Sequence, residues 1–203
     1  MKIICIGRNY AEHAKEMKSA VPAEPVFFLK PDTALLKNNE AFYYPDFSKD
    51  IHHEVEVVLK ISKNGKNIDP KFAHLYYSEI GLGIDFTARD LQSICKEKGL
   101  PWEKAKAFDA SAPLGKFISK EKIKDVTAIS FHLDIAGKTV QKGNTRDLLF
   151  SFDSVISYVS KFITLKIGDL IYTGTPEGVG PVKIGDVLSG YLEHEKMFEF
   201  AVK

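Results

Sequence analysis

The segment Val55-Glu56-Val57-Val58-Leu59-Lys60-Ile61 decides the fold class, because β-branched and aliphatic residues fill most of it. A short run of this kind predicts a β-strand. Comparable runs lie at Ile3–Ile6, Val26–Leu29, Phe42–Tyr44, Ile80–Ile84, Ile129–Ile135, Leu170–Tyr172, Val187–Leu192 and Phe198–Val202. Glycine, proline and asparagine separate the runs, and tight turns are predicted at Asn64-Gly65 and Ala136-Gly137.

Helix signals are fewer, and they fall at Tyr10–Met17, Thr87–Lys98 and Phe152–Phe162. In the second of these, Thr87 is a predicted N-cap and Gly99-Leu100-Pro101 a predicted stop. Many short strands with few helices predict a mainly β (α+β) sandwich or roll, not a doubly wound α/β fold. A length of 203 residues suits one domain, or one domain with a small lobe, and no linker divides the chain.

Charge and cysteine content exclude several classes of function. Lys and Arg total 28 against 27 Asp and Glu, a net charge of +1, which favours no nucleic-acid partner and no anionic membrane. Cys5 and Cys95 read as two reduced thiols. The apolar run that starts the chain is too short for a signal peptide, and no run is long enough for a membrane span, so a cytoplasmic location is expected.

Glu56 in the first segment and Glu54 directly before that segment carry the strongest chemical signal. Side chains alternate along a strand, so Glu54 and Glu56 point the same way. If their face is buried, two adjacent carboxylates repel each other, and a bound cation would remove that cost. A half-exposed strand with both glutamates in water explains the pattern equally well.

A third carboxylate, Asp85, ends the apolar strand Ile80–Ile84 just before the predicted helix. Three carboxylate oxygens with water or substrate suit Mg²⁺ or Mn²⁺, whereas Zn²⁺ prefers His or Cys. The alternative role for Asp85 is that of a helix cap. On that helix, Arg89 and Gln92 are three residues apart and share a face, where they could bind a carboxylate ligand.

Two glycine-rich stretches do not have the spacing of nucleotide-binding loops. Gly81-Leu82-Gly83 lacks a third glycine, and residues 173–180 (TGTPEGVG) lack the Lys-Ser/Thr pair of a P-loop. The second stretch instead predicts a tight loop whose hydroxyls and amides could hold an anion.

Seven strings of residues follow one another along the chain: Gly7-Arg8-Asn9-Tyr10-Ala11-Glu12-His13, Phe28-Leu29-Lys30-Pro31, His52-His53-Glu54-Val55-Glu56, Asp85-Phe86-Thr87-Ala88-Arg89-Asp90-Leu91-Gln92, Lys98-Gly99-Leu100-Pro101-Trp102, Ala105-Lys106-Ala107-Phe108-Asp109 and Thr173-Gly174-Thr175-Pro176-Glu177-Gly178-Val179-Gly180. Their order and content resemble the fumarylacetoacetate hydrolase family, above all its short acylpyruvase and oxaloacetate decarboxylase branch. The resemblance spans nearly the whole chain.

The resemblance implies a mixed β-sandwich roll of the type found in the C-terminal domain of that family, forming one catalytic domain over residues 1–203. It also implies a homodimer. It assigns Mg²⁺ or Mn²⁺ to Glu54, Glu56 and Asp85, the carboxylates singled out above.

The resemblance further assigns substrate binding to Arg89, Gln92 and Thr175, and the active-site lysine to Lys106 rather than Lys104. From its sequence context alone, Lys106 reads as a surface residue.

His13 and Glu16 match the catalytic His–Glu pair of the family, carried on a segment that becomes ordered over the occupied site. The residues alone favour a solvent-facing His13, although a helix would bring residues three apart together. Paired in this way, Glu16 would orient His13 as a general base.

The implied substrate is a small 2-keto acid, and the favoured reaction is hydrolysis of the C–C bond of 3-acylpyruvates. Pyruvate would leave as a metal-stabilised enolate, together with a carboxylic acid. Oxaloacetate decarboxylation passes through the same enolate. Alternatives are isomerisation of the 2-hydroxyhepta-2,4-diene-1,7-dioate type, keto–enol isomerisation, and a ligand-binding relative without catalysis.

Overall fold

Strands dominate the computed structural model, which describes residues 1–17 and 20–203. Within these residues the largest sheet has seven strands. Their spatial order is β2 (Val26–Lys30), β1 (Ile3–Gly7), β11 (Leu170–Tyr172), β5 (Val55–Ile61), β6 (Tyr77–Ile84), β8 (Ala112–Ser119) and β3 (Leu35–Leu36). The sheet is mixed, because β1–β11 and β3–β8 pair in parallel and the other neighbours are antiparallel.

Two smaller sheets complete the β-structure of the described residues. One contains, in spatial order, β10 (Lys138–Asn144), β9 (Ser130–Ile135), β13 (Val187–Leu192) and β14 (Glu195–Ala201). The other contains β12 (Gly180–Pro181), β4 (Ile51–His53) and β7 (Thr87–Ala88).

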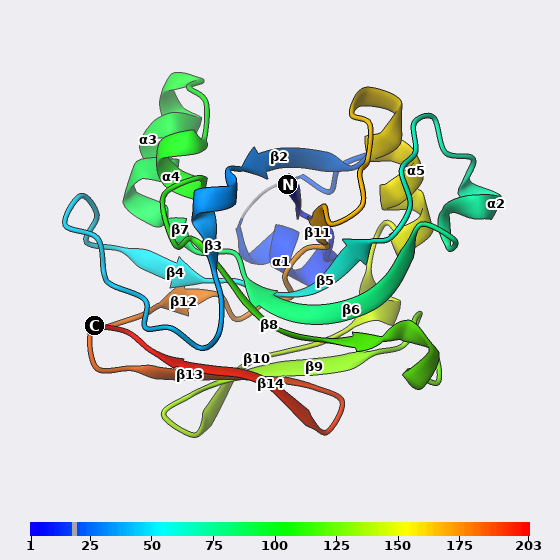
Figure 1. Cartoon of the computed structure of the whole chain (residues 1–203). Helices are drawn as coiled ribbons and strands as arrows, with labels where there is room; N and C mark the ends of the chain where they lie inside the picture. Colours follow the sequence, from blue (N-terminus) through cyan, green and yellow to red (C-terminus); the bar gives the residue numbers. More distant parts are fainter. Residues whose placement is uncertain (18–19) are drawn as a thin grey trace.

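The α-helices are α1 (Ala11–Glu16), α2 (Pro70–Ala73), α3 (Arg89–Lys98), α4 (Glu103–Lys106) and α5 (Phe152–Phe162); the 3₁₀ turns are η1 (Asp32–Ala34), η2 (Lys120–Lys122) and η3 (Thr145–Asp147). In Figure 1, α3 and α4 lie on one side of the sheets, α2 and α5 lie on the other side, and α1 lies between the two sides. None of the helices in the described part of the chain is long and apolar enough to span a membrane.

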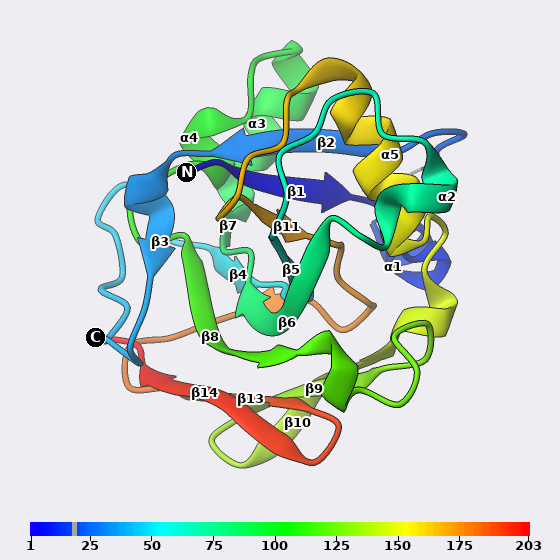
Figure 2. The same ribbon diagram turned by 45° about the vertical axis from the view of Figure 1, so that its right-hand side comes forward.

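The main core lies between the curved large sheet and the four-stranded sheet. Leu82 and Ile84 of β6 meet Leu133, Leu188 and Phe198 of the opposite sheet in one buried cluster. Figure 2 shows β8 descending to lie beside β14, which closes the roll on that side. Each buried aliphatic side chain contributes on the order of 1.5–3 kcal/mol, so burial between the sheets is what sets the architecture. The predicted mainly β sandwich roll is confirmed.

Of three local predictions, one turn is confirmed, and a second turn and a strand are wrong. Ala136-Gly137 forms the tight turn between β9 and β10, with φ of 50° and 77°. Asn64-Gly65 forms no such turn; Gly65 bridges to Leu165 instead. The run Phe42–Tyr44 is not a strand either, because only Phe42 pairs, in an isolated bridge to Val202.

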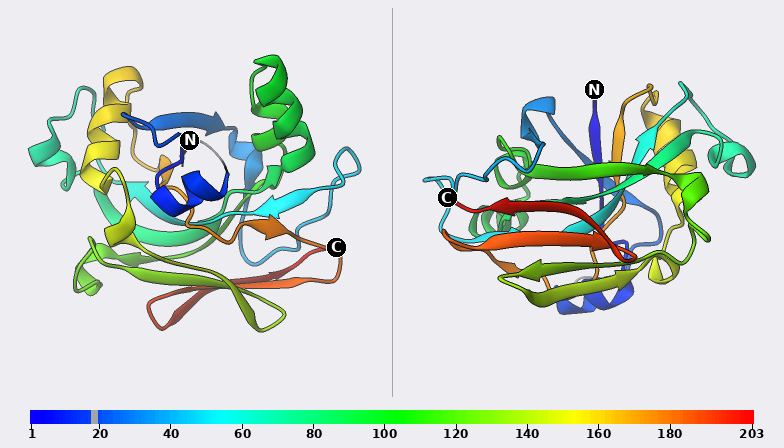
Figure 3. Two further views of the ribbon diagram at one scale, coloured as in Figure 1. Left: turned by 180° about the vertical axis from the view of Figure 1, so that it is seen from behind. Right: turned by 60° about the horizontal axis from the view of Figure 1, so that its bottom comes forward.

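Strand pairing brings the ends of several elements of this fold to one edge of the large sheet. β5 and β6 are antiparallel, so the start of β5 lies beside the end of β6, where the Asp85 amide donates to the Glu54 carbonyl over 2.8 Å. β11 pairs with β5, which places Gly174 next to Glu56. Seen from behind, α1 lies in the space between β2 and the curved sheet (Figure 3).

Candidate functional site

Three buried carboxylates meet at this edge of the large sheet. One carboxylate oxygen from each of Glu54, Glu56 and Asp85 lies within 4.8 Å of the other two. The residues are 6%, 2% and 1% exposed, respectively, so the half-exposed strand expected as one alternative is wrong. Asp85 does not cap a helix, because β7 separates it from α3.

Basic side chains surround the carboxylates. The Lys106 ammonium lies 2.8 Å from Glu54 Oε2 and 2.7 Å from Asp85 Oδ2. Arg89 Nη2 donates to Glu54 Oε1 over 2.7 Å. The Lys30 ammonium forms an ion pair with Asp85 Oδ1 at 2.8 Å. Lys106 is thus a buried member of the site and not a surface residue.

The two glutamates differ in their electrostatic surroundings. Burial acts to raise the pKa of Glu54, but Lys106, then Arg89 and His13, together bring that pKa below its ordinary value. Burial, reinforced by Asp85 and Glu54, holds the pKa of Glu56 well above its ordinary value. Among the described residues no basic side chain forms an ion pair with Glu56, whose Oε2 accepts from the Gly174 amide at 2.7 Å.

This donor set fits a divalent cation. The ligand atoms are carboxylate oxygens, they converge, and Glu56 contributes a buried carboxylate that forms no ion pair with a basic side chain of the described residues. Oxygen-only sites of this kind suit Mg²⁺ and Mn²⁺. Glu54, Glu56 and Asp85 would therefore hold the ion.

The His13–Glu16 pair lies on α1. His13 Nδ1 and Glu16 Oε2 are 3.1 Å apart, and Glu16 Oε1 accepts from the Gly178 amide at 3.1 Å. His13 is 7% exposed, so the solvent-facing position favoured by the residues alone is wrong. Because Glu16 engages Nδ1, the other ring nitrogen of His13 is left for a substrate.

The remaining predicted residues lie close by. Arg89 Nη1 donates to Gln92 Oε1 over 2.7 Å, as their spacing on α3 predicts. Arg89 Nε is buried and has no hydrogen-bond partner among the described residues, so one donor stays available. The Thr175 hydroxyl accepts from Gln141 Nε2 over 2.9 Å.

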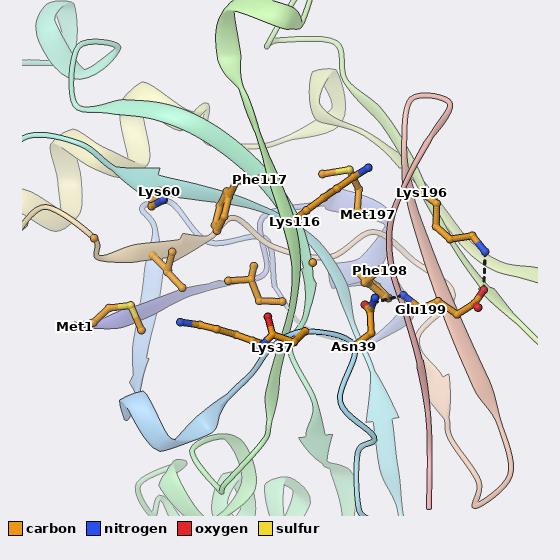
Figure 4. A pocket seen from close by; sticks show the side chains of 15 residues that line it. Met1, Lys37, Asn39, Lys60, Lys116, Phe117, Lys196, Met197, Phe198 and Glu199 are labelled. Carbon is orange, nitrogen blue, oxygen red and sulfur yellow. Dashed lines mark hydrogen bonds and ion pairs between the residues drawn. The ribbon is translucent and has the colours of Figure 1, made fainter.

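All predicted site residues except Glu16 line one pocket of about 40 Å³, and Glu16 reaches it through His13. A larger hollow, of about 660 Å³, lies elsewhere and is lined mainly by residues of β8 and β14 (Figure 4). Lys37, Lys60, Lys116 and Lys196 line that hollow, but none of the predicted site residues does. The carboxylates and His13 therefore share the smaller pocket, apart from the larger hollow.

Sequence reasoning assigned no role to several neighbours of the site. Arg8 and Lys30 were noted only within strings, Thr87 was predicted as a helix cap, and Lys96 was given no role. Thr87 Oγ1 donates to Glu54 Oε1 over 2.9 Å, and α3 begins at Arg89 without a side-chain cap. The signal for Lys30 was its place at the end of an apolar strand, directly before Pro31.

The fold and this pocket define a class of β-rich protein whose buried carboxylates can hold a metal ion beside a histidine. The chain belongs to the fumarylacetoacetate hydrolase family: the family model for the fumarylacetoacetate (FAA) hydrolase C-terminal region matches residues 2–200. The family predicted from the seven strings is confirmed.

Similar proteins share most of their length with this chain. The mitochondrial oxaloacetate tautomerase FAHD1 of Mus musculus is 46% identical over 201 residues, covering 99% of this chain and 91% of the mouse protein. The mitochondrial oxaloacetate decarboxylase of Dictyostelium discoideum is 48% identical over 188 residues, 92% of this chain and 86% of its own.

A solved structure shows the same fold with ligands. It is the fumarylpyruvate hydrolase of Pseudomonas aeruginosa in complex with Mn²⁺ and pyruvate, with a TM-score of 0.94 and 35% identity. The match covers 100% of this chain and 89% of that one. The chain is thus similar in sequence to proteins named as a tautomerase, a decarboxylase and a hydrolase, and it shares the fold of the hydrolase.

Proposed function

We propose that this protein is a divalent-metal-dependent enzyme that interconverts the keto and enol forms of oxaloacetate, or of a closely similar small 2-oxo acid. The observation that carries the proposal is that three buried carboxylates and the His13 imidazole line one pocket. The tautomerase and decarboxylase names of relatives that match over nearly the whole chain support oxaloacetate as the substrate.

Each group in the pocket has a task in enolate chemistry. A divalent ion on the three carboxylates would act as a Lewis acid that stabilises negative charge on the 2-oxo oxygen. The free donors of Arg89, with Gln92 beside it, bind the adjacent carboxylate. The Lys106 ammonium adds a second positive charge for the enolate oxygen.

His13 moves the proton. Its free ring nitrogen accepts a proton from C3 of the keto form, which leaves the enolate. The same proton then passes to the enolate oxygen to give the enol, so no atom is gained or lost. Glu16 holds Nδ1 and stabilises the imidazolium during this transfer.

Cleavage of 3-acylpyruvates is the second candidate, and the His13–Glu16 pair favours it. The pair can deprotonate water for attack on the distal carbonyl; the C3–C4 bond then breaks and the pyruvate enolate leaves. A likeness to a fumarylpyruvate hydrolase with bound pyruvate supports this reading. Decarboxylation of oxaloacetate releases the same enolate with CO₂.

The test uses chelator-treated protein with Mg²⁺ or Mn²⁺ added back. Keto–enol exchange of oxaloacetate is followed by absorbance, and pyruvate release is followed from oxaloacetate and from acetylpyruvate. We expect exchange well above the metal-only blank. Replacing the proton-transfer group in His13→Ala should slow it about 100-fold or more.

The matched control is Lys15→Ala, which changes an exposed residue of the same helix and should keep wild-type rates. Pyruvate release from acetylpyruvate without enol exchange would make hydrolysis the function. A protein that binds Mg²⁺ and oxalate but turns over neither substrate would be a ligand-binding relative. A homodimer, a cytoplasmic location and a single domain over residues 1–203 stay predictions.

A further inference from the structure

Two basic residues line the pocket without belonging to the groups described so far. Arg8 follows β1, and Lys96 lies near the end of α3. In the part of the chain that the structure describes, neither forms an ion pair with a carboxylate. The pocket therefore has two cations that the carboxylate cluster does not neutralise.

Lys96 faces the pocket because of its helical spacing. It lies four residues beyond Gln92 and seven beyond Arg89, which places all three on one face of α3. Its ammonium lies 5.8 Å from the centroid of the Trp102 ring. Burial lowers the pKa of Lys96, and the positive charges of Arg89 and then Arg8, which line the same pocket, lower it further.

Arg8 has a backbone conformation that does not suit an arginine. Its φ is 59°, in the left-handed region that glycine adopts without strain. Half-buried against the pocket, its side chain forms no hydrogen bond in the described structure that would explain this conformation. Glycine at this position would suit the backbone better, so the side chain of Arg8 has a use other than stability.

The charges in the pocket do not cancel once a metal ion is present. Arg8, Arg89, Lys96 and Lys106 supply four positive charges, and the three carboxylates supply three negative ones. A divalent ion adds two more, which leaves a net charge of +3 among the ion and these lining residues. One substrate carboxylate leaves a clear positive excess, whereas a dianion offsets most of it.

We propose that Arg8 and Lys96 bind the distal carboxylate of a 2-oxo dicarboxylate substrate and select dianions over monoanions. This inference rests on the proposed function, because Arg89 and Gln92 are then occupied by the first carboxylate. The Trp102 ring lies beside the Lys96 ammonium, the Phe28 ring packs against Trp102, and both rings line the pocket. These apolar rings strengthen the attraction between the cations and the distal carboxylate by excluding water.

Oxaloacetate and acetylpyruvate make a matched pair of probes. They share the carboxylate, the 2-oxo group and C3, and they differ in the distal group, a carboxylate in one and an acetyl group in the other. Oxalate, which has no distal group, is the reference for the metal end of the pocket.

The experiment measures KM and kcat with Mg²⁺ for wild type, Lys96→Gln and Arg8→Gly. Each variant should raise KM for oxaloacetate about threefold to tenfold, the effect of losing one partly exposed charge pair. KM for acetylpyruvate, the inhibition constant of oxalate, and kcat should change less than about twofold. Lys98→Gln removes a charge from the same helix outside the pocket and should match wild type on every substrate.

A stability measurement distinguishes a role of Arg8 in substrate binding from a role in folding. Arg8→Gly should be at least as resistant to urea as wild type while binding oxaloacetate more weakly. Equal losses on oxaloacetate and acetylpyruvate, or an unchanged KM for oxaloacetate in both variants, would overturn the subsite.

The proposed function fails separately, if wild type turns over neither substrate. In that case calorimetric dissociation constants for the same two ligands still decide the subsite. Weaker binding of oxaloacetate alone, in Lys96→Gln and Arg8→Gly, supports it, and unchanged binding excludes it.

Discussion

At the scale of single residues, the most demanding feature is a fully buried lysine beside the carboxylates. The Lys30 side chain is 0% exposed, and its ammonium contacts Asp85, the carbonyl of Phe86 and both the carbonyl and the hydroxyl of Ser111. It also donates to the carbonyl of Lys106. A buried ammonium is tolerated because each of its protons has an acceptor.

Lys30→Met should therefore destabilise the fold. The substitution keeps the apolar stem but leaves Asp85 Oδ1 and several carbonyl oxygens without their donor. Breaking a buried pair from one side costs about 3–5 kcal/mol, and the free energy of unfolding in urea measures it. Lys37→Met, at an exposed lysine after β3, should stay within about 0.5 kcal/mol of wild type. A variant as stable as wild type would mean that Lys30 only fills space.

The carboxylates of the site could be found from sequence, whereas Lys30 could not. Alternation along a strand places Glu54 and Glu56 on one face, and that is a local property. The burial of Lys30 depends on acceptors at Asp85, Phe86 and Ser111, which are remote in sequence. A lysine before a proline otherwise looks like the exposed end of a strand.

At the scale of elements, β6 shows why a glycine pair stands in a central strand. Tyr172 of β11 reaches across β5, and its hydroxyl donates to the carbonyls of Ala112 and Pro113, at 3.3 and 3.2 Å. A Cβ on Gly83 would lie 2.7 Å from the Tyr172 ring and 2.8 Å from the Pro113 carbonyl oxygen. In the glycine pair that resembled part of a phosphate loop, Gly83 makes room for this crossing ring. Gly81 makes room for Phe117 instead, whose ring a Cβ would meet at 2.9 Å.

Gly83→Ala should destabilise the protein by about 1–3 kcal/mol, as overpacking of a filled core does. Backbone on one side and a fixed ring on the other leave the added methyl group little room to adjust. Thermal or urea unfolding measures the loss. Gly7→Ala in β1 is the matched control, because its Cβ would meet nothing nearer than 3.9 Å. If both variants unfold alike, the crossing of Tyr172 is not what requires glycine.

Element types were more predictable than element ends. The strands around Ile3, Val55, Ile80, Leu170 and Val187 were predictable because β-branched runs are a local signal. The start of α3 was not, because Thr87 directs its hydroxyl to Glu54, a partner 33 residues away, instead of to its own helix. β8 was missed since its proline and glycine hide a strand that only its neighbours define.

At the scale of the whole molecule, the two sheets hold several mutually repelling charges in place. The core between the sheets fixes the ends of β5, β6 and β11, and these ends fix Glu54, Glu56 and Asp85. Without a metal ion the repulsion falls mainly on Glu56, which has no ion-pair partner among the described residues. The free energy of unfolding should therefore increase when the metal ion binds. Removing the charge of Glu56 should reduce this increase.

Glu56→Gln tests this dependence. In chelator the variant should be at least as stable as wild type, because glutamine keeps an acceptor for the Gly174 amide and removes a repelling charge. With Mg²⁺ at 100 times its dissociation constant, wild type should gain about 2.7 kcal/mol and overtake the variant, which lacks one ligand. Urea unfolding with and without Mg²⁺ shows which of the two proteins is more stable under each condition. Glu12→Gln, at an exposed acid on α1, should gain as much from Mg²⁺ as wild type. Equal gains in Glu56→Gln and wild type would show that the ion binds somewhere other than the three carboxylates.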